Sequence, residues 1–209
     1  MSYSNIVWDW NGTLLNDLQA GVDTLGEMLE RHGRQALTVD EYKRMFGFPV
    51  ADFYERIGFS MAGYALHEVS VEFVETYERH ARGVQLNAGV REVLETVRQS
   101  GRRQYILSAL REDLLRQMTA DFGIDVYFDA LCGSDNIYAA GKVERGRRML
   151  KECRLTGQTL MVGDTEHDAE VAQALGFDCV LFDGGHNDRE RLRKKAPVIS
   201  SLAELVRYY

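Results

Sequence analysis

The sequence predicts an α/β fold: a parallel β-sheet whose first strand is followed by an inserted, all-helical segment. A short, largely apolar run, Asn5–Trp10, ends abruptly in polar residues and a glycine. Apolar residues then recur at helical spacing as far as about Arg82, with no convincing strand among them. From Asn87 onward, apolar runs of strand length alternate with amphipathic stretches, which is typical of repeated βα units.

The opening run predicts a buried strand that leads into a loop, because several consecutive apolar residues suit a strand covered on both faces. In the segment that follows, apolar residues lie three or four positions apart, as on one face of a helix. These residues are Leu18, Val22, Leu25, Leu29, Val69, Phe73 and Tyr77. Turn-forming residues divide the segment into several helices; they are Gly33, Gly47, Pro49 and Gly58.

The rest of the chain predicts a parallel sheet with helices on both of its faces. The expected helices are Val90–Gln99, Glu112–Asp121, Val143–Glu152, Asp168–Leu175 and one that begins at Leu202. The expected strands are Gln104–Ser108, Phe128–Cys132, Thr159–Val162, Cys179–Phe182 and Val198–Ser200. Since the opening strand belongs to the same sheet, we expect a Rossmann-like core domain of residues 1–15 and 84–209, with an inserted helical domain of residues 16–83.

Composition narrows the class of function. The formal charge of the 209-residue chain is −7, which argues against a nucleic-acid or anionic-membrane partner. No window is apolar enough for a membrane span. The three cysteines, Cys132, Cys153 and Cys179, are widely spaced, which favours free thiols in a cytoplasmic protein. No sequence feature indicates an oligomeric state.

Polar residues stand at the carboxyl ends of the predicted strands, where open α/β sheets bind their ligands. Asp9 follows the first strand, and Ser108 ends the second. Lys142 begins a helix, and Asp164 and Asp168 follow the strand Thr159–Val162. We therefore expect three carboxylates, a hydroxyl and an ammonium group at one edge of the sheet.

This set of groups indicates phosphoryl chemistry. The carboxylates of Asp9 and Asp164 would repel each other unless a divalent cation lies between them. Oxygen ligands of this kind suit Mg²⁺, which also accepts an oxygen of a substrate phosphate. A carboxylate in this position can attack phosphorus, while Lys142 and Ser108 stabilise the transferring group.

The motifs DxxGT(L), a strand-end Ser or Thr, Lys and GDxxxD resemble, in their order and placement, the four motifs of the haloacid dehalogenase superfamily. The inserted helical segment is similar to that superfamily's cap domain of the first type. The phosphoglycolate phosphatase-like branch is the closest likeness. The resemblance implies a phosphatase that depends on Mg²⁺ and acts on a small phosphorylated metabolite.

The resemblance also implies roles for individual residues. Asp9 would be the nucleophile and a metal ligand, together with the main-chain carbonyl of Asn11 and the carboxylate of Asp164. Asp168 would orient the water shell of the metal. The residues that would bind the phosphoryl group are Gly12, Thr13, Ser108, Ala109 and Lys142. Less specific interpretations remain open: Ser108 could cap a helix, Lys142 could lie on the surface, and Asp168 could be a helix N-cap.

Asn11 departs from the family pattern, in which a second aspartate protonates the leaving group and then activates water. An amide forms hydrogen bonds but exchanges no proton at neutral pH, and general acid–base help is worth about 10²–10⁴-fold in rate. Three interpretations follow. The chain is a phosphatase that is slow or prefers leaving groups needing little protonation, a non-catalytic relative that binds a phosphorylated metabolite or a protein partner, or a phosphonatase-type hydrolase.

The cap sequence bears on these alternatives. A phosphonatase needs a cap lysine, but Val50 stands where it is expected, and Lys43 is the one lysine of the cap. We expect the turn Phe46–Pro49 to face the active site. Arg44 and Arg56, with Lys43, are candidate anion-binding residues, although solvent exposure is the simpler expectation. His186, which follows a pair of glycines, could reach the cleft or close a loop, and we expect it to close a loop.

Overall fold

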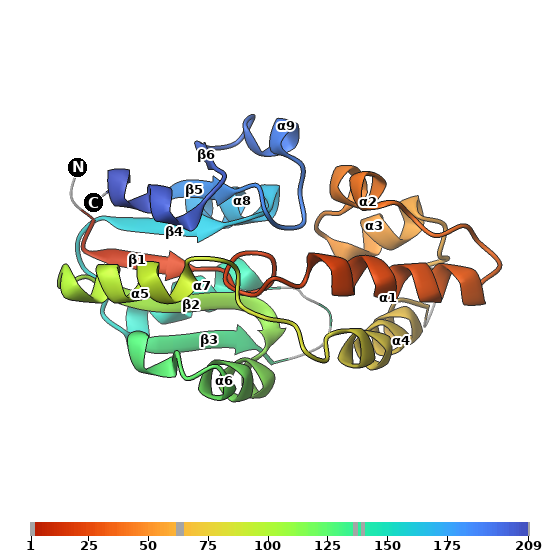
Figure 1. Cartoon of the computed structure of the whole chain (residues 1–209), viewed down its shortest axis with the longest axis horizontal. Coiled ribbons are helices and arrows are strands. Elements are labelled where there is room, and N and C mark those ends of the chain that lie inside the picture. Colours follow the sequence, from red (N-terminus) through yellow and green to blue (C-terminus); the bar gives the residue numbers. More distant parts are fainter. Residues whose placement is uncertain (1–2, 62–64, 136–137, 139–140, 209) are drawn as a thin grey trace.

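The computed structural model describes residues 3–61, 65–135, 138 and 141–208. Within these residues, six parallel strands form one sheet in the order β3-β2-β1-β4-β5-β6 (Figure 1). The strands are β1 Asn5–Trp8, β2 Arg103–Arg111, β3 Ala130–Ser134, β4 Thr159–Gly163, β5 Asp178–Phe182 and β6 Val198–Ile199. The predicted α/β class is confirmed.

Helices cover both faces of the sheet. Successive residues of its central strand β1 point to opposite sides, and since they are apolar on both sides, each face needs a covering layer. Ile6 and Trp8 pack into the apolar cluster formed with α5, α6 and the C-terminal 3₁₀ helix, whereas Val7 packs against α7 and α8. The core helices are α5 Val90–Gln99, α6 Glu112–Asp121, α7 Lys142–Glu152, α8 Glu166–Leu175 and α9 Arg189–Leu192, and the 3₁₀ helices are Asp125–Tyr127 and Leu202–Tyr208. None of the helices in the described ranges is both long and apolar enough to cross a membrane.

Three predicted elements differ in detail from the observed ones. The helix expected from Leu202 is a 3₁₀ helix, and the amides of Ser200 and Ser201 both donate to Glu204 Oε1 at its start. The third strand begins at Ala130 rather than Phe128, because a 3₁₀ turn occupies the residues just before Phe128. The second strand continues beyond Ser108 to Arg111, with a shift of register after Leu107.

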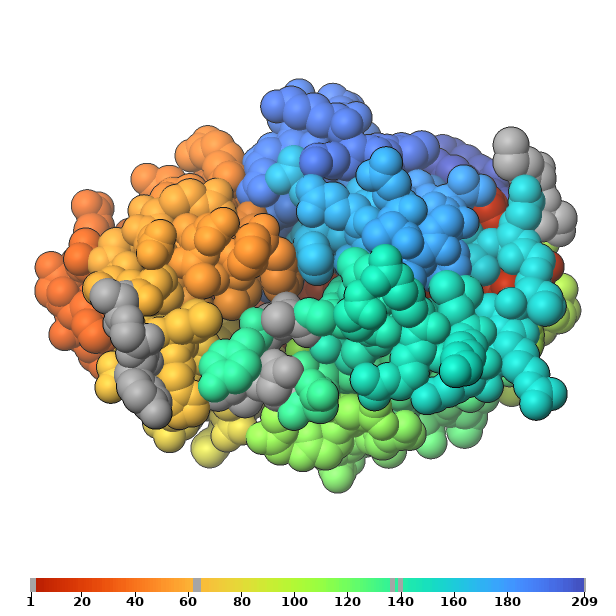
Figure 2. All heavy atoms as spheres, turned by 180° about the vertical axis from the view of Figure 1, so that it is seen from behind, coloured from red at the N-terminus to blue at the C-terminus, as the bar shows by residue number. Residues whose placement is uncertain are grey.

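The helical segment between β1 and α5 has its own apolar core. It contains α1 Leu18–Arg31, α2 Val39–Met45, α3 Val50–Arg56 and α4 Ala65–His80, and it lies beside the carboxyl ends of the strands (Figures 1 and 2). The two chain segments that lead into and out of it run together: Asn16 N donates to Gln85 O at 2.9 Å, and Asn87 N donates to Leu14 O at 2.8 Å. We propose that this crossing marks the boundary between a core of residues 1–15 and 84–209 and a cap of residues 16–83.

Arg191 joins the cap to the core on one side. Its Nη1 donates to the carbonyl oxygens of Lys43, Arg44 and Phe46 at 3.2, 3.0 and 2.6 Å, and its guanidinium forms an ion pair with Glu166 of α8. These bonds satisfy carbonyl groups near the end of α2 that have no partner further along the helix. We call this set of contacts the Arg191 latch.

Replacing Arg191 with Met should loosen the end of α2. The substitution keeps much of the aliphatic length and removes charge-assisted hydrogen bonds, each worth about 1.5–3 kcal/mol. Hydrogen exchange of the Phe46 amide, which donates to Tyr42 O at 2.7 Å, should become faster by at least about tenfold.

Arg193→Met is the matched control, because the Arg193 side chain forms only an exposed ion pair with Glu190 among the contacts of the described residues. Equal exchange rates at Phe46 in the Arg191→Met and Arg193→Met variants would contradict a latching role.

Candidate active site

The register of the sheet brings the first and fourth strand ends together. Trp8 is paired with Val162, and the amide of Asp9 donates to Val162 O at 2.8 Å. Asp9 therefore leaves β1 beside the point where Asp164 leaves β4. Parallel pairing of β1 and β4 predicts that their ends converge, and the side chains of Asp9 and Asp164 do lie close together.

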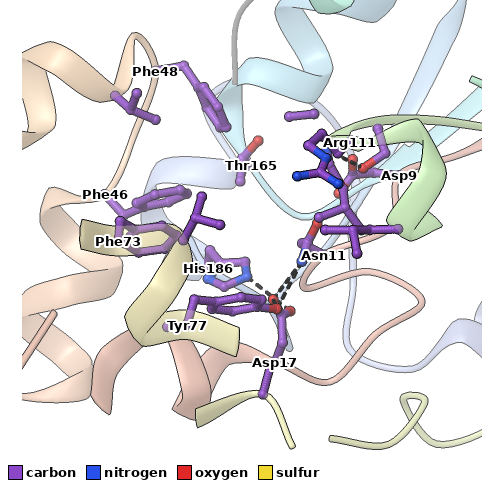
Figure 3. A pocket seen from close by; sticks show the side chains of 18 of the residues that line it. Asp9, Asn11, Asp17, Phe46, Phe48, Phe73, Tyr77, Arg111, Thr165 and His186 are labelled. Carbon is purple, nitrogen blue, oxygen red and sulfur yellow. Dashed lines mark hydrogen bonds and ion pairs between the residues drawn. The ribbon is translucent and has the colours of Figure 1, made fainter. Parts of the chain in front are cut away.

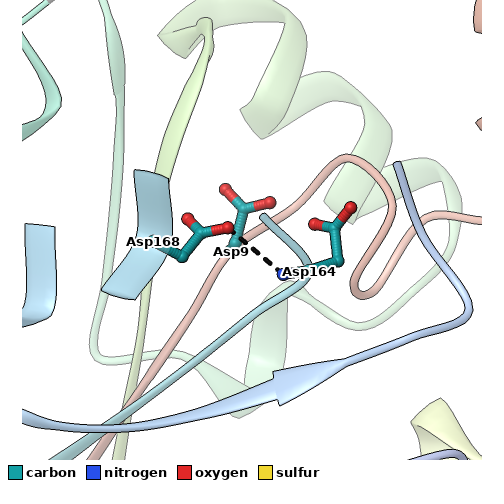
Figure 4. Close-up of side chains that lie close together, drawn as sticks. All are labelled: Asp9, Asp164 and Asp168. Atoms are coloured by element: carbon teal, nitrogen blue, oxygen red, sulfur yellow. Dashed lines mark hydrogen bonds between the residues drawn. The ribbon is translucent and has the colours of Figure 1, made fainter. Parts of the chain in front are cut away.

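Asp9, Asp164 and Asp168 form a buried acidic cluster, in which one carboxylate oxygen of each lies within 4.8 Å of the others (Figure 4). Lys142 enters the same space from the start of α7. Its Nζ lies 2.5 Å from Asp9 Oδ1 and 2.6 Å from Asp168 Oδ1. Lys142 is only 4% exposed, so the interpretation of this residue as a surface lysine is wrong.

Asp168 holds the start of α8 in place. Thr165, not Asp168, is the N-cap of that helix, and the two form a capping box. Asp168 Oδ2 accepts from Thr165 Oγ1 at 2.7 Å and from the amide of Asp164 at 3.2 Å, while its other oxygen contacts Lys142. Burial alone would raise the pKa of Asp168, but Lys142 and these hydrogen bonds lower it. Asp168 thus orients both Lys142 and the loop that carries Asp164.

The acidic cluster carries more negative charge than Lys142 balances. Burial raises the pKa of Asp9 well above its usual range; Lys142 opposes this, and the carboxylates of Asp168 and Asp164 reinforce it. Burial likewise raises the pKa of Asp164 to about 6. A divalent cation would supply the missing positive charge, and the donors present are the oxygen ligands that Mg²⁺ takes in proteins. The residues present therefore fit such an ion.

Gly12 and Thr13 support the loop after β1. The Gly12 amide donates to Asp17 Oδ1 at 2.7 Å and the Thr13 amide to Trp10 O at 3.3 Å, so both amides already have partners. Thr13 Oγ1 donates to Asp164 Oδ1 at 2.9 Å. Gly12 has a φ of +75°, and a Cβ there would lie 2.2 Å from Asp164 Oδ2, so the close approach of the loop to Asp164 requires glycine. Substrate binding by Gly12 and Thr13 stays a prediction.

Ser108, Ala109 and Lys142 line a cavity between the cap and the core, with Asp9 and Asn11 beside them. The Ser108 hydroxyl oxygen accepts from the amide of Leu110 at 3.0 Å. Ser108 does not cap α6, whose N-cap is Arg111. With Asp168, which also lines the cavity, the structure brings six of the predicted site residues to one surface.

The side chain of Asn11 belongs to a hydrogen-bond network that the sequence did not reveal (Figure 3). Its Nδ2 donates to Asp17 Oδ2 at 2.8 Å and lies 3.2 Å from the hydroxyl oxygen of Tyr77, which itself donates to Asp17 Oδ2 at 2.6 Å. His186 Nε2 lies 3.2 Å from Asp17 Oδ1, and Tyr42 contacts the other ring nitrogen at 2.8 Å. We call these residues the Asp17 network.

His186 therefore lies in the cavity rather than only closing a loop, and its amide donates to Asp164 Oδ2 at 2.6 Å. Burial alone would lower the pKa of His186, but the Asp17 carboxylate outweighs burial and raises it to about 9. Burial likewise disfavours charge on Asp17, yet His186 and the hydrogen bonds of the network lower its pKa. Asp17 and His186 are thus a buried ion pair beneath Asn11. One sequence clue existed: Asp17 precedes the first predicted helix, but its side chain does not cap that helix.

The cavity has a volume of about 390 Å³, and the cap contributes Phe46 and Phe48 to its lining, as predicted for the turn Phe46–Pro49. The candidate cap cations Lys43, Arg44 and Arg56 are not part of the lining; Lys43 instead donates to Asp183 O at 2.8 Å. Val50 lines the cavity, and no cap lysine does so among the described residues. A phosphonatase mechanism, which needs such a lysine, is not supported.

A family model for haloacid dehalogenase-like hydrolases matches residues 6–182. The chain belongs to this family. The resemblance identified from the motifs is thereby confirmed, and the parallel sheet with an insertion after β1 is the architecture that a haloacid dehalogenase-like hydrolase was expected to have.

The chain is also similar to proteins with different names. The chain is 25% identical over 206 residues to tyrosine-protein kinase PtkA of Mycobacterium tuberculosis, covering 96% of this chain and 69% of the relative. It is 24% identical over 189 residues to a phosphoglycolate phosphatase of Rhodobacter capsulatus, covering 87% and 84%. The structure of the M. tuberculosis PtkA superposes with a TM-score of 0.82 at 24% identity, covering 99% and 98%. The prediction of a phosphoglycolate phosphatase-like hydrolase is confirmed at the level of the family, but the names of these relatives imply different substrates.

Removing the carboxylate of Asp17 should destabilise this haloacid dehalogenase-like hydrolase strongly. Asp17→Ala removes the counterion that keeps His186 protonated and the acceptor of the Asn11, Gly12 and Tyr77 donors, and loss of one partner of a buried pair costs about 3–5 kcal/mol. Urea unfolding at pH 7 measures the change in the free energy of unfolding. Asp23→Ala, at an exposed position on the same helix, is the control and should change it by less than about 0.5 kcal/mol.

The stabilisation should also depend on pH. Because the pKa of His186 is raised to about 9 from an ordinary value near 6.5, its contribution is complete below about pH 6.5 and is lost as the pH rises through about 9. The difference in the free energy of unfolding between the wild type and His186→Gln should therefore shrink between pH 7 and pH 10. A constant difference across this range would rule out a charged His186.

Proposed function

We propose that this chain is a Mg²⁺-dependent phosphatase that hydrolyses a small phosphomonoester through an aspartyl-phosphate intermediate on Asp9. The observation that carries the proposal is the buried cluster of Asp9, Asp164 and Asp168, which Lys142 contacts and which meets a cavity between cap and core through Asp9, Asp168 and Lys142. The family supports a phosphatase-type reaction, and the acidic cluster supports a divalent cation. Free cysteines in the structure are compatible with a cytoplasmic location, which we also propose.

Each residue at the cavity floor then has a chemical role. Asp9 attacks phosphorus with the carboxylate oxygen that is not held by Lys142. Lys142 keeps Asp9 oriented and places its positive charge beside the equatorial phosphoryl oxygens, toward which Ser108 turns its hydroxyl group. Asp9, Asp164 and the Asn11 carbonyl would hold Mg²⁺, which supplies charge neutralisation when it is bound.

Asn11 is expected to slow the two steps of this reaction that need a proton transfer. Its amide cannot protonate the departing oxygen or remove a proton from the water that attacks the phosphoenzyme. Phosphoryl transfer to Asp9 is therefore expected to depend on the acidity of the leaving group, and hydrolysis of the phosphoenzyme is expected to be slow.

Hydrolysis of an acyl or aryl phosphate should require Mg²⁺ and Asp9. Acetyl phosphate, whose leaving group needs little protonation, should be turned over with Mg²⁺ and not after chelation with EDTA. Asp9→Asn should lower kcat by at least about 10³-fold, because the amide is a poor nucleophile. Release of inorganic phosphate measures the rate.

Glu144→Gln is the matched control for removal of one negative charge, since Glu144 is exposed on α7 and pairs only with Arg147 among the described contacts. If Asp9→Asn and Glu144→Gln hydrolyse acetyl phosphate equally fast, Asp9 is not the nucleophile.

Restoring a carboxyl group at position 11 should speed the hydrolysis of alkyl phosphates. Asn11→Asp places a second carboxyl group beside Asp17 Oδ2, which is 2.8 Å from the present amide nitrogen. The double variant Asn11→Asp/Asp17→Asn exchanges the amide and the carboxyl group and preserves one hydrogen bond between them. We expect kcat for ethyl phosphate to rise by about 10²–10⁴-fold in at least one of these variants.

Asp17→Asn alone is the control, because it alters the network without supplying a proton donor at position 11. Variants that are folded and bind Mg²⁺ but are no faster than the wild type would contradict this account of Asn11.

The alternative is that the chain is a non-catalytic relative, and the observation that favours it is Asn11. Such a protein would bind a phosphorylated metabolite or a protein partner at the same cavity. Saturable binding of phosphate with Mg²⁺, without turnover of acyl, aryl or alkyl phosphates, would support this function over hydrolysis.

A further inference from the structure

The cavity has a charged floor, formed by Asp9, Lys142 and Asp168, and its other walls are largely apolar. Phe48, Phe73 and Val74 of the cap face the cavity on one side, and Leu110, Leu114 and Met118 of the core do so on the other. All six are half-buried, so apolar surface remains uncovered on both sides of the space. Figure 3 shows the aromatic rings of Phe46, Phe48 and Phe73 across the cavity from Asp9.

The size of the cavity is suited to a ring attached to a phosphoryl group. A cavity of about 150 Å³ lined by apolar side chains binds benzene. The volume here is about 390 Å³ and includes the floor where the phosphoryl group would lie. Space for an aromatic ring is therefore available in the cavity that the proposed nucleophile lines.

The cations of the lining do not favour a small acidic substrate. Lys142 already contacts Asp9 and Asp168, and His186 contacts Asp17. The remaining cations of the lining, as far as the chain is described, are Arg82 and Arg111, and Arg111 is ion-paired with Asp113. Both arginines are partly or largely exposed, so solvent screens their charge. Apart from them, a carboxylate held next to the phosphoryl group would face phenylalanine, leucine and methionine side chains.

Asn11 restricts which leaving groups can depart, and this restriction does not depend on the apolar walls of the cavity. Because a carboxylate only accepts hydrogen bonds, the contact with Asp17 fixes the amide nitrogen of Asn11 toward the network and turns the amide oxygen away from it. Position 11 therefore offers the departing oxygen no proton. Phenols have a pKa of about 10, against about 15.7 for water, so a phenolate departs unprotonated far more readily than an alkoxide.

From the apolar walls and the tethered Asn11 together, we infer that the substrate is a phosphate ester of a phenolic hydroxyl group on a small molecule. This inference rests on the proposed phosphatase function and specifies its substrate class. The ring would pack between α4 and α6, the phosphoryl group would lie at Asp9, and the phenolate would leave without a proton from the enzyme.

Three esters and one acyl phosphate separate the two parts of the inference. Phenyl phosphate has a ring and an acidic leaving group, benzyl phosphate has a ring and a poor leaving group, acetyl phosphate has only the good leaving group, and ethyl phosphate has neither. With Mg²⁺, the two ring-bearing esters should have a KM at least about tenfold lower than their small counterparts. Formation of the phosphoenzyme should be faster with phenyl phosphate than with benzyl phosphate by about 10²-fold or more, measured as release of phenol or benzyl alcohol in a single turnover, since the phosphoenzyme that follows is the same for both.

Two substitutions test the walls from opposite sides. Leu114→Asn and Val74→Asn place an amide against the ring, and neither side chain is among those that pack into the apolar cores described above. Each should raise the KM for phenyl phosphate by at least about tenfold and raise the KM for acetyl phosphate much less. Gln117→Ala, at an exposed position of α6, should change neither value.

Phosphonates make ring binding measurable without turnover. Phenylphosphonate cannot be hydrolysed by loss of phenolate, and calorimetry with Mg²⁺ should show it to bind at least about tenfold more tightly than methylphosphonate. If esters are hydrolysed but the small ones have the lower KM, the aromatic substrate class is overturned while the phosphatase function stands. If no ester is hydrolysed and phenylphosphonate still binds more tightly, the phosphatase function fails and the ring preference of the cavity is supported. Equal binding of both phosphonates would overturn that preference.

Discussion

The contact of Lys142 with Asp9 and Asp168 is the interaction on which the site depends. It brings a positive charge into a place where three buried carboxylates meet, and it comes from a helix that begins 133 residues after Asp9. Buried carboxylates left without such a partner would take up protons, and Asp9 would then be a poor nucleophile. The same ammonium group is held on its other side by Asp168, whose second oxygen fixes the loop that carries Asp164. Charge balance and loop geometry are thus maintained by one set of contacts.

Residues that follow strand ends could be predicted from the sequence, because parallel strands bring their carboxyl ends to a common edge whatever the details of packing. This is why Asp9 and Asp164 can be identified and why the order of strands and helices can be anticipated, whereas Lys142, at the start of a helix, is identified by its place in the motif order. The extent of β2 beyond Ser108 and the 3₁₀ form of the C-terminal helix were not, because they depend on local hydrogen bonds rather than on hydrophobic periodicity.

The Asp17 network lay beyond sequence reasoning for a different reason. Asp17 and His186 are 169 positions apart and belong to no shared motif. Each has a plausible local role, as a helix cap and as a loop residue, that hides the contact between them. Only the packing of the cap against the core brings Tyr42 and Tyr77 around the pair. The apolar walls were equally hidden, since helical periodicity does not distinguish residues that fill the cap interior from those that border the cavity.

The Arg191 latch makes the two sides of the cap unequal. Arg191 ties the end of α2 to the core through three carbonyl groups, and Asn187 adds a fourth contact by donating to Phe46 O at 2.9 Å. The backbone of Phe46, whose side chain contributes to the cavity wall, is thereby fixed to the core by two side chains that are not themselves part of the lining. A change at Arg191 or Asn187 would thus reach the wall without altering any group that a substrate could touch.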